Sequence, residues 1–272
     1  MKRFPNMKML LLDFDGTLFQ PGRFISQADV NILKKIEGRL IRVIATGRSL
    51  FSLKKVIDDS FPIDYLIFST GAGLMNWKNK QIIHSSLISG PIVDEIIDIL
   101  KNNNHSFFVH RPLPDNHYFY FFVGKEWPAD FERRFKLYQP FALDLSARKT
   151  GEPASQILVI THNLQKIKNE LHILSEQINV IRATSPLDGQ TIWVELFEKD
   201  TNKALTAQRL ANYLNILPEN TIAVGNDFND VALLEWAGKA FVVDSAPQEL
   251  KKRFNVLALN DGGILKEIFS SF

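Results

Sequence analysis

Residues 9–17 read Met-Leu-Leu-Leu-Asp-Phe-Asp-Gly-Thr, an apolar run that ends in a pair of acidic residues. The run over 9–12 predicts a short, buried β-strand. Residues two apart in an extended segment point to the same side, so we expect Asp13 and Asp15 to present two carboxylates to one spot just past the strand. Such a pair suits chemistry in which one carboxylate attacks while the other moves a proton or helps to hold a metal ion. The structural alternative is a strand end followed by an Asp-Gly turn, and the longer pattern favours the chemical interpretation over it.

The sequence around this stretch alternates between strand and helix patterns. Apolar runs predict strands at 41–45 and 65–68, and helical spacing predicts helices over 26–37, with Ser26 as N-cap, and from 49 to about 59. This order with short links predicts a parallel sheet with right-handed crossovers. The alternation returns near the C-terminus, with strands predicted at 191–196, 221–224 and 240–243 and helices at 203–214 and 230–237.

The middle of the chain has a different character. A predicted hairpin over 73–83, turning at Lys78-Asn79, leads into a region of mixed patterns. Its helices are predicted at 93–102, 129–137 and 164–177, and its strands at 118–123, 156–161 and 180–183. We therefore predict an α/β fold: a Rossmann-like parallel sheet core formed by residues 1–85 and 187–272, with an inserted α+β domain over 86–186.

Composition narrows the classes of partner and chemistry. Lys and Arg number 32 against 30 Asp and Glu, and this near balance argues against nucleic acid or an anionic membrane as the main partner. The absence of cysteine excludes disulfides, thiolate catalysis and zinc–thiolate sites. The apolar run near the N-terminus is too short for a secretory signal, and no run is long enough to span a membrane. We expect a cytoplasmic protein, a monomer or weak homo-oligomer, that acts on a small molecule.

Three further clusters stand where a strand ends or a helix begins. Thr46-Gly47-Arg48-Ser49 offers a hydroxyl and backbone N–H groups to an anion, although N-capping by Thr46 or Ser49 would explain it equally well. Lys203 opens a predicted helix, where positive charge is unfavourable unless it is aimed at an anion. A solvated surface lysine is the alternative there, and both pairs of interpretations stay open at this point.

The third cluster is Gly-Asn-Asp-Phe-Asn-Asp at 225–230, directly after a predicted strand. Acidic and amide oxygens at this density suit a hard cation such as Mg²⁺, and a polar turn capped by Asp230 is the alternative. The carboxyl ends of parallel strands meet at one edge of a sheet, which is where open α/β sheets bind their ligands. We therefore expect all four clusters to be neighbours in space.

Taken in order, Asp13-x-Asp15-Gly16-Thr17, Thr46, Lys203 and the 225–230 loop resemble the motifs of the haloacid dehalogenase superfamily of phosphohydrolases. The position and mixed character of the insert are similar to the large α/β cap of the sugar-phosphatase-like branch, which includes Cof-type and sucrose-phosphatase-like proteins. The resemblance covers the whole chain. It implies a magnesium-dependent phosphatase that hydrolyses a small phosphorylated metabolite, with a sugar phosphate as the expected substrate.

The resemblance also implies a role for each residue. Asp13 would be the nucleophile and form an aspartyl-phosphate, and Asp15 would protonate the leaving alcohol and then deprotonate the attacking water. Thr46 and Gly47 would hold phosphate oxygens, and Lys203 would neutralise charge. A carboxylate and a phosphate at 4 Å repel by about 4 kcal/mol at an effective dielectric constant of 20. Lys203 and Mg²⁺ would therefore be needed to offset this repulsion. Further substrate contacts are expected from Asn229 and Arg111. The expected Mg²⁺ ligands are Asp13, Asp15 through its backbone carbonyl, Asn226, Asp227 and Asp230.

The chain departs from the family pattern in the metal loop. Relatives often begin this loop with Gly-Asp, whereas here Asn226 follows Gly225 and Asp227 comes one place later. Either residue completes the expected metal shell, and an amide brings no negative charge, so we expect weaker magnesium affinity. Two other functions stay open: a phosphomutase or phosphotransferase with the same motifs, and a sugar-phosphate-binding regulator without turnover.

Overall fold

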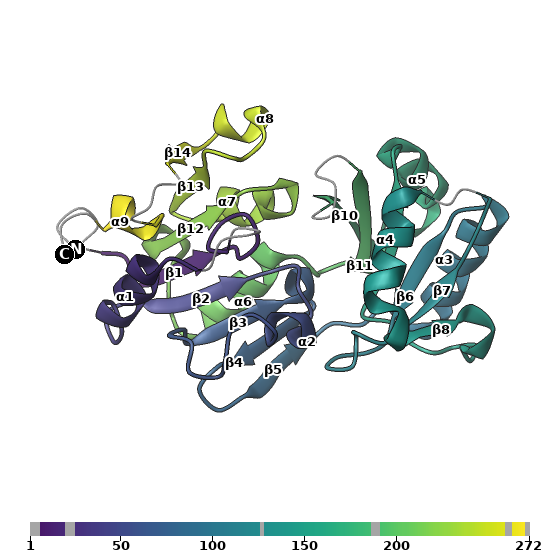
Figure 1. Ribbon diagram of the computed structural model, residues 1–272, viewed down its shortest axis with the longest axis horizontal. Coiled ribbons are helices and arrows are strands. Elements are labelled where there is room, and N and C mark those ends of the chain that lie inside the picture. The colour runs from purple at the N-terminus through teal and green to yellow at the C-terminus, as the bar shows by residue number, and fades with distance from the viewer. Residues whose placement is uncertain (1–5, 20–24, 126–127, 186–190, 259–262, 270–272) are drawn as a thin grey trace. The chain divides into compact units, whose positions relative to one another are not determined.

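The computed structural model describes residues 6–19, 25–125, 128–185, 191–258 and 263–269. By its internal contacts the chain divides into two compact units (Figure 1). The core unit comprises Met1–Arg48, Leu53–His84 and Lys203–Phe272, and the insert unit comprises Ser49–Ser52 and Ser85–Asn202. Within the described ranges, no helix is long and apolar enough to cross a lipid bilayer.

An eight-stranded sheet forms the centre of the core unit, in the order β14-β13-β12-β1-β2-β3-β4-β5. The first six of these strands are parallel to their neighbours, whereas β4 runs antiparallel to β3. From β1 the chain moves outward to β2 and β3, and after the insert it moves outward in the opposite direction from β12. The switch in direction therefore lies between β1 and β12, the place where open α/β sheets bind ligands. The strands are β1 (Met9–Leu12), β2 (Ile41–Ala45), β3 (Tyr65–Phe68), β4 (Gly73–Asn76), β5 (Gln81–Ser85), β12 (Thr221–Gly225), β13 (Lys239–Val243) and β14 (Asn255–Leu257).

Helices bury the faces of this sheet. Alternate residues of β1, such as Met9 and Leu11, pack in one apolar cluster with Ala207 and Leu210 of α6 and Leu233 of α7. All of β1 is buried, as expected for a central parallel strand covered on both faces. The described helices numbered with this unit are α1 (Gln27–Lys35), α2 (Leu50–Leu53), α6 (Lys203–Tyr213), α7 (Val231–Trp236), α8 (Gln248–Lys251) and α9 (Leu265–Ile268), of which α2 belongs to the insert unit by its contacts.

The ends of α1 are fixed by side chains. Ser26 Oγ accepts a hydrogen bond from the backbone N–H of Ala28, so the predicted N-cap is present. Inside the helix, the buried Asp29 carboxylate accepts the backbone N–H groups of Ile264 and Leu265 at 3.3 and 2.9 Å. That carboxylate joins α1 to the start of α9, and the two helices are far apart in the sequence.

The insert unit is built on a six-stranded sheet in the order β10-β11-β9-β6-β7-β8. Its pairs are antiparallel except for β7 with β8. One face carries an apolar cluster that includes Val93 of α3 and Ile167 of α5, and a second cluster includes Phe131 of α4. The elements are α3 (Gly90–Asn102), β6 (Phe107–His110), β7 (Phe119–Phe122), α4 (Ala129–Tyr138), β8 (Ala142–Asp144), β9 (Gln156–Thr161), α5 (Leu164–Glu170), β10 (Ile178–Thr184) and β11 (Ile192–Glu198).

The predicted fold class is confirmed, and some details are corrected. The strand predicted at 191–196 exists as β11, but it pairs with β9 and β10 in the insert rather than joining the core sheet. The predicted boundary at 186/187 lies outside the described residues, and the contact-based division comes after Asn202. An apolar run has the same pattern in either sheet, so periodicity alone does not assign its partner. The helix predicted from 49 ends at Leu53, and the helix predicted over 164–177 ends at Glu170.

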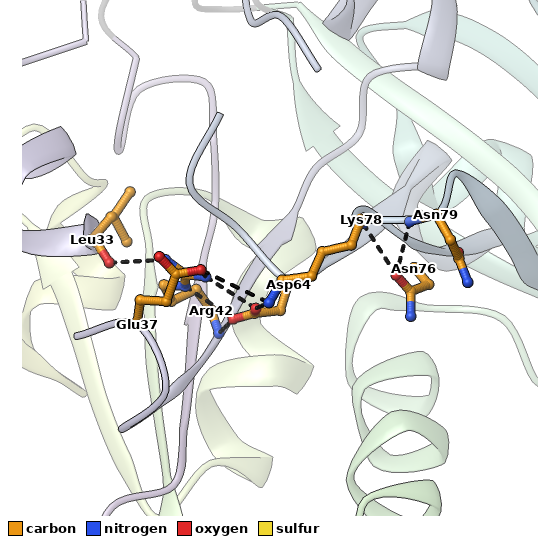
Figure 2. Close-up of polar contacts among 7 residues, drawn as sticks. All are labelled: Leu33, Glu37, Arg42, Asp64, Asn76, Lys78 and Asn79. Atoms are coloured by element: carbon orange, nitrogen blue, oxygen red, sulfur yellow. Dashed lines mark hydrogen bonds and ion pairs between the residues drawn. The ribbon is translucent and has the colours of Figure 1, made fainter. Parts of the chain in front are cut away.

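A buried arginine joins three parts of the core unit (Figure 2). Arg42, on β2, is 1% exposed. Its Nε and Nη2 donate to Asp64 at 2.9 and 3.0 Å, Nη2 also donates to Glu37 at 3.1 Å, and Nη1 donates to the carbonyl of Leu33 at 3.1 Å. Lys78 Nζ lies 3.4 Å from Asp64 and comes from the hairpin turn. The guanidinium therefore links β2 to the end of α1 and to Asp64, and Asp64 in turn lies beside Lys78 of the β4–β5 hairpin.

The hairpin itself forms as predicted, with its turn at Lys78-Asn79. The side-chain oxygen of Asn76 accepts the backbone N–H groups of Lys78 and Asn79 at 3.1 and 3.4 Å (Figure 2). Lys80, at the end of the turn, adopts a positive φ of 60°. Local side-chain bonds of this kind are why Asn is favoured in turns.

Asp64→Asn should lower the free energy of unfolding by about 3 kcal/mol, because it leaves a buried guanidinium with half of its counter-charge. Burial alone would raise the pKa of Asp64, but the bonds from Arg42 outweigh burial and lower it. The difference between wild type and variant is therefore present above the unfolded-state pKa of about 3.9 and is lost as pH falls through the lower folded-state value. Urea unfolding of wild type and variant at pH 7 and at pH 3 measures the loss of stability and its dependence on pH. Lys78→Met, which removes an exposed partner, should cost less than about 1 kcal/mol and is the control; an equal loss at both pH values would contradict the account.

Candidate active site

Three charged side chains meet at the switch point of the core sheet. Lys203 Nζ, at the start of α6, donates to Asp13 Oδ1 at 2.7 Å and to Asp230 Oδ1 at 2.6 Å. Asp13 directly follows β1, and Asp230 directly precedes α7. The exposed fractions are 4% for Asp13, 1% for Lys203 and 0% for Asp230. Two buried carboxylates thus share one ammonium, which leaves this cluster with a net charge of about −1 when all three groups are ionised.

Asp230 is held from both sides. Its Oδ2 accepts the backbone N–H groups of Asn226 and Asp227 at 2.9 and 3.2 Å, while its Oδ1 accepts from Lys203. The loop needs glycine at 225, because a Cβ there would lie 2.6 Å from Asp230 Cβ and 2.7 Å from Asp230 Cγ. Both carboxylate oxygens of Asp230 accept hydrogen bonds, so the role of this side chain is to orient Lys203 and the 225–230 loop.

Asp13 differs from Asp230 because one of its carboxylate oxygens, the buried Oδ2, accepts no hydrogen bond from the described residues. Burial and the negative charge of Asp230 raise the pKa of Asp13 to about 7, against the opposing effect of Lys203. Burial would lower the pKa of Lys203, but the two carboxylates outweigh burial and raise it. An anion with a free lone pair, held by a fixed cation, is an arrangement suited to nucleophilic attack or to binding a further cation.

A second group of residues lies at the ends of β2 and β3. Thr46 is fully buried, and its Oγ1 accepts the N–H of Arg48 at 3.1 Å. A Cβ built on Gly47 would lie 3.5 Å from Thr70 Oγ1 and 3.8 Å from Asn229 Nδ2, so these side chains face the Gly47 backbone. Of the two candidate N-caps, Ser49 takes this role for α2, because its Oγ accepts the N–H of Ser52 at 3.2 Å. Thr46 is therefore not needed for capping.

Thr70 was not singled out by its chemistry in the sequence, yet it lies in this group. Ser69, Thr70 and Gly71 adopt φ values of 50°, 54° and 106° in succession. Left-handed backbone at non-glycine residues costs about 1–3 kcal/mol each and gathers at functional sites. The turn is held by the bond from Thr70 N–H to the Thr46 carbonyl at 3.0 Å and by Thr206 Oγ1, which donates to the Gly71 carbonyl at 2.8 Å. Only its position after the third strand marks it in the sequence.

Asp15 lies on the more exposed side of the β1 end. Its side chain is 36% exposed and makes a two-point ion pair with Arg48, at 2.7 Å from Nε to Oδ2 and 2.6 Å from Nη2 to Oδ1. The sequence did not predict this pair. The intervening loop is tight, since Gly16 has φ of +78° and a Cβ there would lie 2.2 Å from Asn226 Nδ2.

The residues expected to hold a metal ion are partly assembled. Asp13 has the unpartnered Oδ2, and Asn226 packs against the Asp13–Gly16 loop, whereas both oxygens of Asp230 are taken. Over the described ranges, no cluster of three or more His, Asp or Glu side chains is arranged to hold a metal ion. A cation at this site would therefore draw on amide and backbone oxygens as well as carboxylates, which is the ligand set that magnesium accepts.

Arg111 and His110 are neighbouring residues of the insert with different surroundings. Arg111 is exposed and packs its guanidinium 6.0 Å from the ring centroid of Tyr118, and its contact with substrate stays a prediction. His110 is buried, with Nδ1 2.7 Å from the carbonyl of Asn116 and Nε2 3.2 Å from Arg134. Burial and the charge of Arg134 lower the pKa of His110 to about 3, so it is a neutral structural residue.

A family model described as haloacid dehalogenase-like hydrolase matches residues 10–268. The chain belongs to this family of hydrolases, as its motifs indicated, and it is an enzyme of the phosphatase type. A putative phosphatase of Mycoplasma genitalium is 23% identical over 241 residues, which cover 84% of each protein. The Bacillus subtilis protein YwtE, named a 5-amino-6-(5-phospho-D-ribitylamino)uracil phosphatase, is 23% identical over 271 residues and 91% of each protein.

Solved structures share the fold over nearly the whole chain. The phosphatase BT1666 of Bacteroides thetaiotaomicron has a TM-score of 0.76 and 20% identity, and the match covers 97% of this chain and 94% of that one. A sugar phosphatase of subclass IIB, BT4131, has a TM-score of 0.74 and 18% identity, with coverage of 97% and 96%. The Rossmann-like core with an inserted second domain is thus the architecture of the family.

Gly16→Ala should reduce turnover of p-nitrophenyl phosphate by about a hundredfold, because the new methyl group displaces Asn226 and shifts the loop that orients Asp230. Gly38→Ala is a matched control, since its φ is +70° and a Cβ there meets nothing within 4 Å. Both variants should lose about 1 kcal/mol of stability from the left-handed backbone, and only Gly16→Ala should lose activity. Steady-state kinetics and thermal melts separate the two effects; equal activity in both variants would contradict the assignment.

Proposed function

We propose that this chain is a magnesium-dependent phosphatase that hydrolyses a small sugar or polyol phosphate through an aspartyl-phosphate on Asp13. The observation that carries the proposal is the state of Asp13: it is buried, it is fixed by Lys203 through Oδ1, and no described residue bonds to its Oδ2. Oδ2 is the oxygen that is available to form a bond to phosphorus. Lys203 keeps the carboxylate oriented and reduces its repulsion of the anionic substrate.

The reaction has two displacements at phosphorus. In the first, Asp13 forms a bond to phosphorus while the bond from phosphorus to the substrate oxygen breaks, and Asp15 gives its proton to the leaving alcohol. In the second, water attacks phosphorus, Asp15 takes a proton from it, and the Asp13–phosphorus bond breaks to release inorganic phosphate. Gly47 and Asn229 are assigned to the phosphate oxygens, because the Asn229 side chain faces the Gly47 backbone. Thr46, which precedes Gly47 at the end of β2, is assigned with them.

The charge of the buried cluster supports a divalent cation beside it. Among the described residues, Asp13 and Asp230 share the ammonium of Lys203, so a net charge of about −1 is left in a low-dielectric site when all three groups are ionised. A carboxylate oxygen of Asp13, the backbone carbonyl of Asp15 and a side-chain oxygen of either Asn226 or Asp227 would hold Mg²⁺, with Asp230 supporting the loop. When bound, magnesium supplies charge neutralisation to the phosphoryl oxygens.

The relatives support the class of substrate. The YwtE protein of Bacillus subtilis carries in its name a phosphorylated ribityl compound, and one solved neighbour is described as a sugar phosphatase. An exposed Arg111 in the insert offers a donor fork to hydroxyl or anionic groups on such a substrate. A phosphotransferase would use the same residues with a second alcohol in place of water, so product analysis separates the two activities.

Asp13→Asn should lower kcat for p-nitrophenyl phosphate by at least about 10⁴-fold, since an amide cannot act as the nucleophile. EDTA should abolish turnover by wild type, and added magnesium should restore it. Asp98→Asn, an exposed substitution on α3, should retain full activity and is the control. Turnover by Asp13→Asn at the wild-type rate would contradict the mechanism. Binding of sugar phosphates without turnover, by an intact wild type supplied with magnesium, would favour the regulator instead.

Asn226→Asp should tighten magnesium activation by about tenfold, because affinity for hard cations rises with the number of charged ligands. Asp227→Asn is the companion variant: it weakens activation if Asp227 is a ligand and leaves it unchanged if Asn226 fills that place. Activity against magnesium concentration measures both constants. An Asn226→Asp variant with unchanged or weaker affinity would show that residue 226 does not face the ion.

A further inference from the structure

Asp15 and Arg48 form a two-point ion pair in the core unit, outside the buried triad of Asp13, Lys203 and Asp230. Arg48 presents one edge of its guanidinium, Nε and Nη2, to the two oxygens of Asp15 at 2.7 and 2.6 Å. Two parallel bonds of this kind fix the plane and direction of a carboxylate as well as its charge. Nothing in the proposed mechanism uses Arg48, although it neighbours Thr46 and Gly47 in the sequence.

Arg48 is itself held rigidly. Its backbone N–H donates to Thr46 Oγ1 at 3.1 Å, and its carbonyl accepts from the N–H of Ser69 at 2.8 Å. Its guanidinium carbon lies 5.3 Å from the ring centroid of Phe14 and 5.4 Å from that of Phe19. The two rings are stacked at 5.4 Å and 8°, and Phe19 N–H donates to the Phe14 carbonyl at 2.8 Å. Cation–π contacts and backbone bonds therefore set the guanidinium in one place.

A phosphate-binding role is the other use of an arginine beside an anion site. Here the edge formed by Nε and Nη2 is already occupied by a carboxylate, and that edge is the one that makes two-point contacts. Each Asp15 oxygen accepts one bond from Arg48 and keeps a second lone pair, so either oxygen can still face a substrate. The pairing is therefore compatible with acid and base work by Asp15.

We propose that Arg48 is a positioning residue that fixes the orientation of the Asp15 carboxyl group for proton transfer to the leaving oxygen. This inference rests on the proposed function, because it takes Asp15 to be the general acid. Without Arg48, the partly exposed Asp15 side chain is free to populate other rotamers, and proton transfer needs donor and acceptor oxygens within about 2.6–3.2 Å. Loss of Arg48 should then resemble loss of the acid itself.

The test compares two substrates of similar shape, phenyl phosphate and p-nitrophenyl phosphate, at saturating magnesium. Phenol is much the poorer leaving group, so its departure depends on protonation, whereas p-nitrophenolate leaves unaided. The readout is the ratio of kcat/KM for p-nitrophenyl phosphate to kcat/KM for phenyl phosphate. Arg48→Met removes the charge and keeps the aliphatic packing, Arg48→Lys keeps the charge without the fork, and Asp15→Asn removes the acid. Circular dichroism and thermal melts establish that each variant is folded.

Asp15→Asn should raise the ratio by about tenfold or more, and Arg48→Met should raise it to a similar extent. Arg48→Lys should not restore the wild-type ratio, and the Asp15→Asn/Arg48→Met double variant should be no higher than Asp15→Asn alone. The inhibition constant of inorganic phosphate should change by less than about threefold in Arg48→Met, as expected for a residue that does not bind the phosphate.

Three results would overturn the proposal, and each shows a different assignment to be wrong. If Asp15→Asn raises the ratio but folded Arg48→Met or Arg48→Lys leaves it at the wild-type value, the positioning role is wrong and the proposed function stands. If Asp15→Asn itself leaves the ratio unchanged, the assignment of the general acid fails and the inference fails with it. A large rise in the phosphate inhibition constant of Arg48→Met, with an unchanged ratio, would make Arg48 a phosphate-binding residue.

Discussion

One ammonium shared between two buried carboxylates is the constraint on which the active site depends. Lys203 takes part in both ion pairs from the first turn of α6, and it thereby joins the end of β1 to the start of α7. In the sequence, Asp13 lies 190 residues and Asp230 lies 27 residues from Lys203. The strand order of the core sheet brings the three residues together. Because desolvated charges are costly, the arrangement holds only while all three groups stay in contact.

The two carboxylates of the Asp13–Asp15 pair occupy different surroundings, and this difference fits their proposed division of work. Asp13 is buried against a lysine, whereas Asp15 is partly exposed and faces an arginine. A nucleophile benefits from exclusion of water and from a fixed cation, while an acid that also acts as a base must exchange protons with an incoming water. Both environments are reached from one short segment, because Asp13 and Asp15 stand two residues apart after β1.

Much of this was predictable from particular residues. The alternation around 9–17 gave the parallel core, and the motif order located Asp13, Lys203 and the 225–230 loop at one edge. The sequence did not reveal that β11 belongs to the insert, because an apolar strand fits either sheet. Nor did it indicate that both oxygens of Asp230 are taken, or that Arg48 faces Asp15, since side-chain pairing across 33 residues leaves no periodic signal. The sequence assigned no role to Thr70, because its left-handed backbone is visible only in three dimensions.

The central claim is that Asp13 is phosphorylated during turnover, and chemical trapping tests it most directly. Wild-type enzyme turning over p-nitrophenyl phosphate with magnesium is quenched in acid and reduced with borohydride, which converts an aspartyl-phosphate to homoserine. The account predicts homoserine at position 13 in the peptide mass spectrum, dependent on substrate, with Asp15 unmodified. Steady turnover with no modified residue, or modification at a carboxylate other than Asp13, would contradict it.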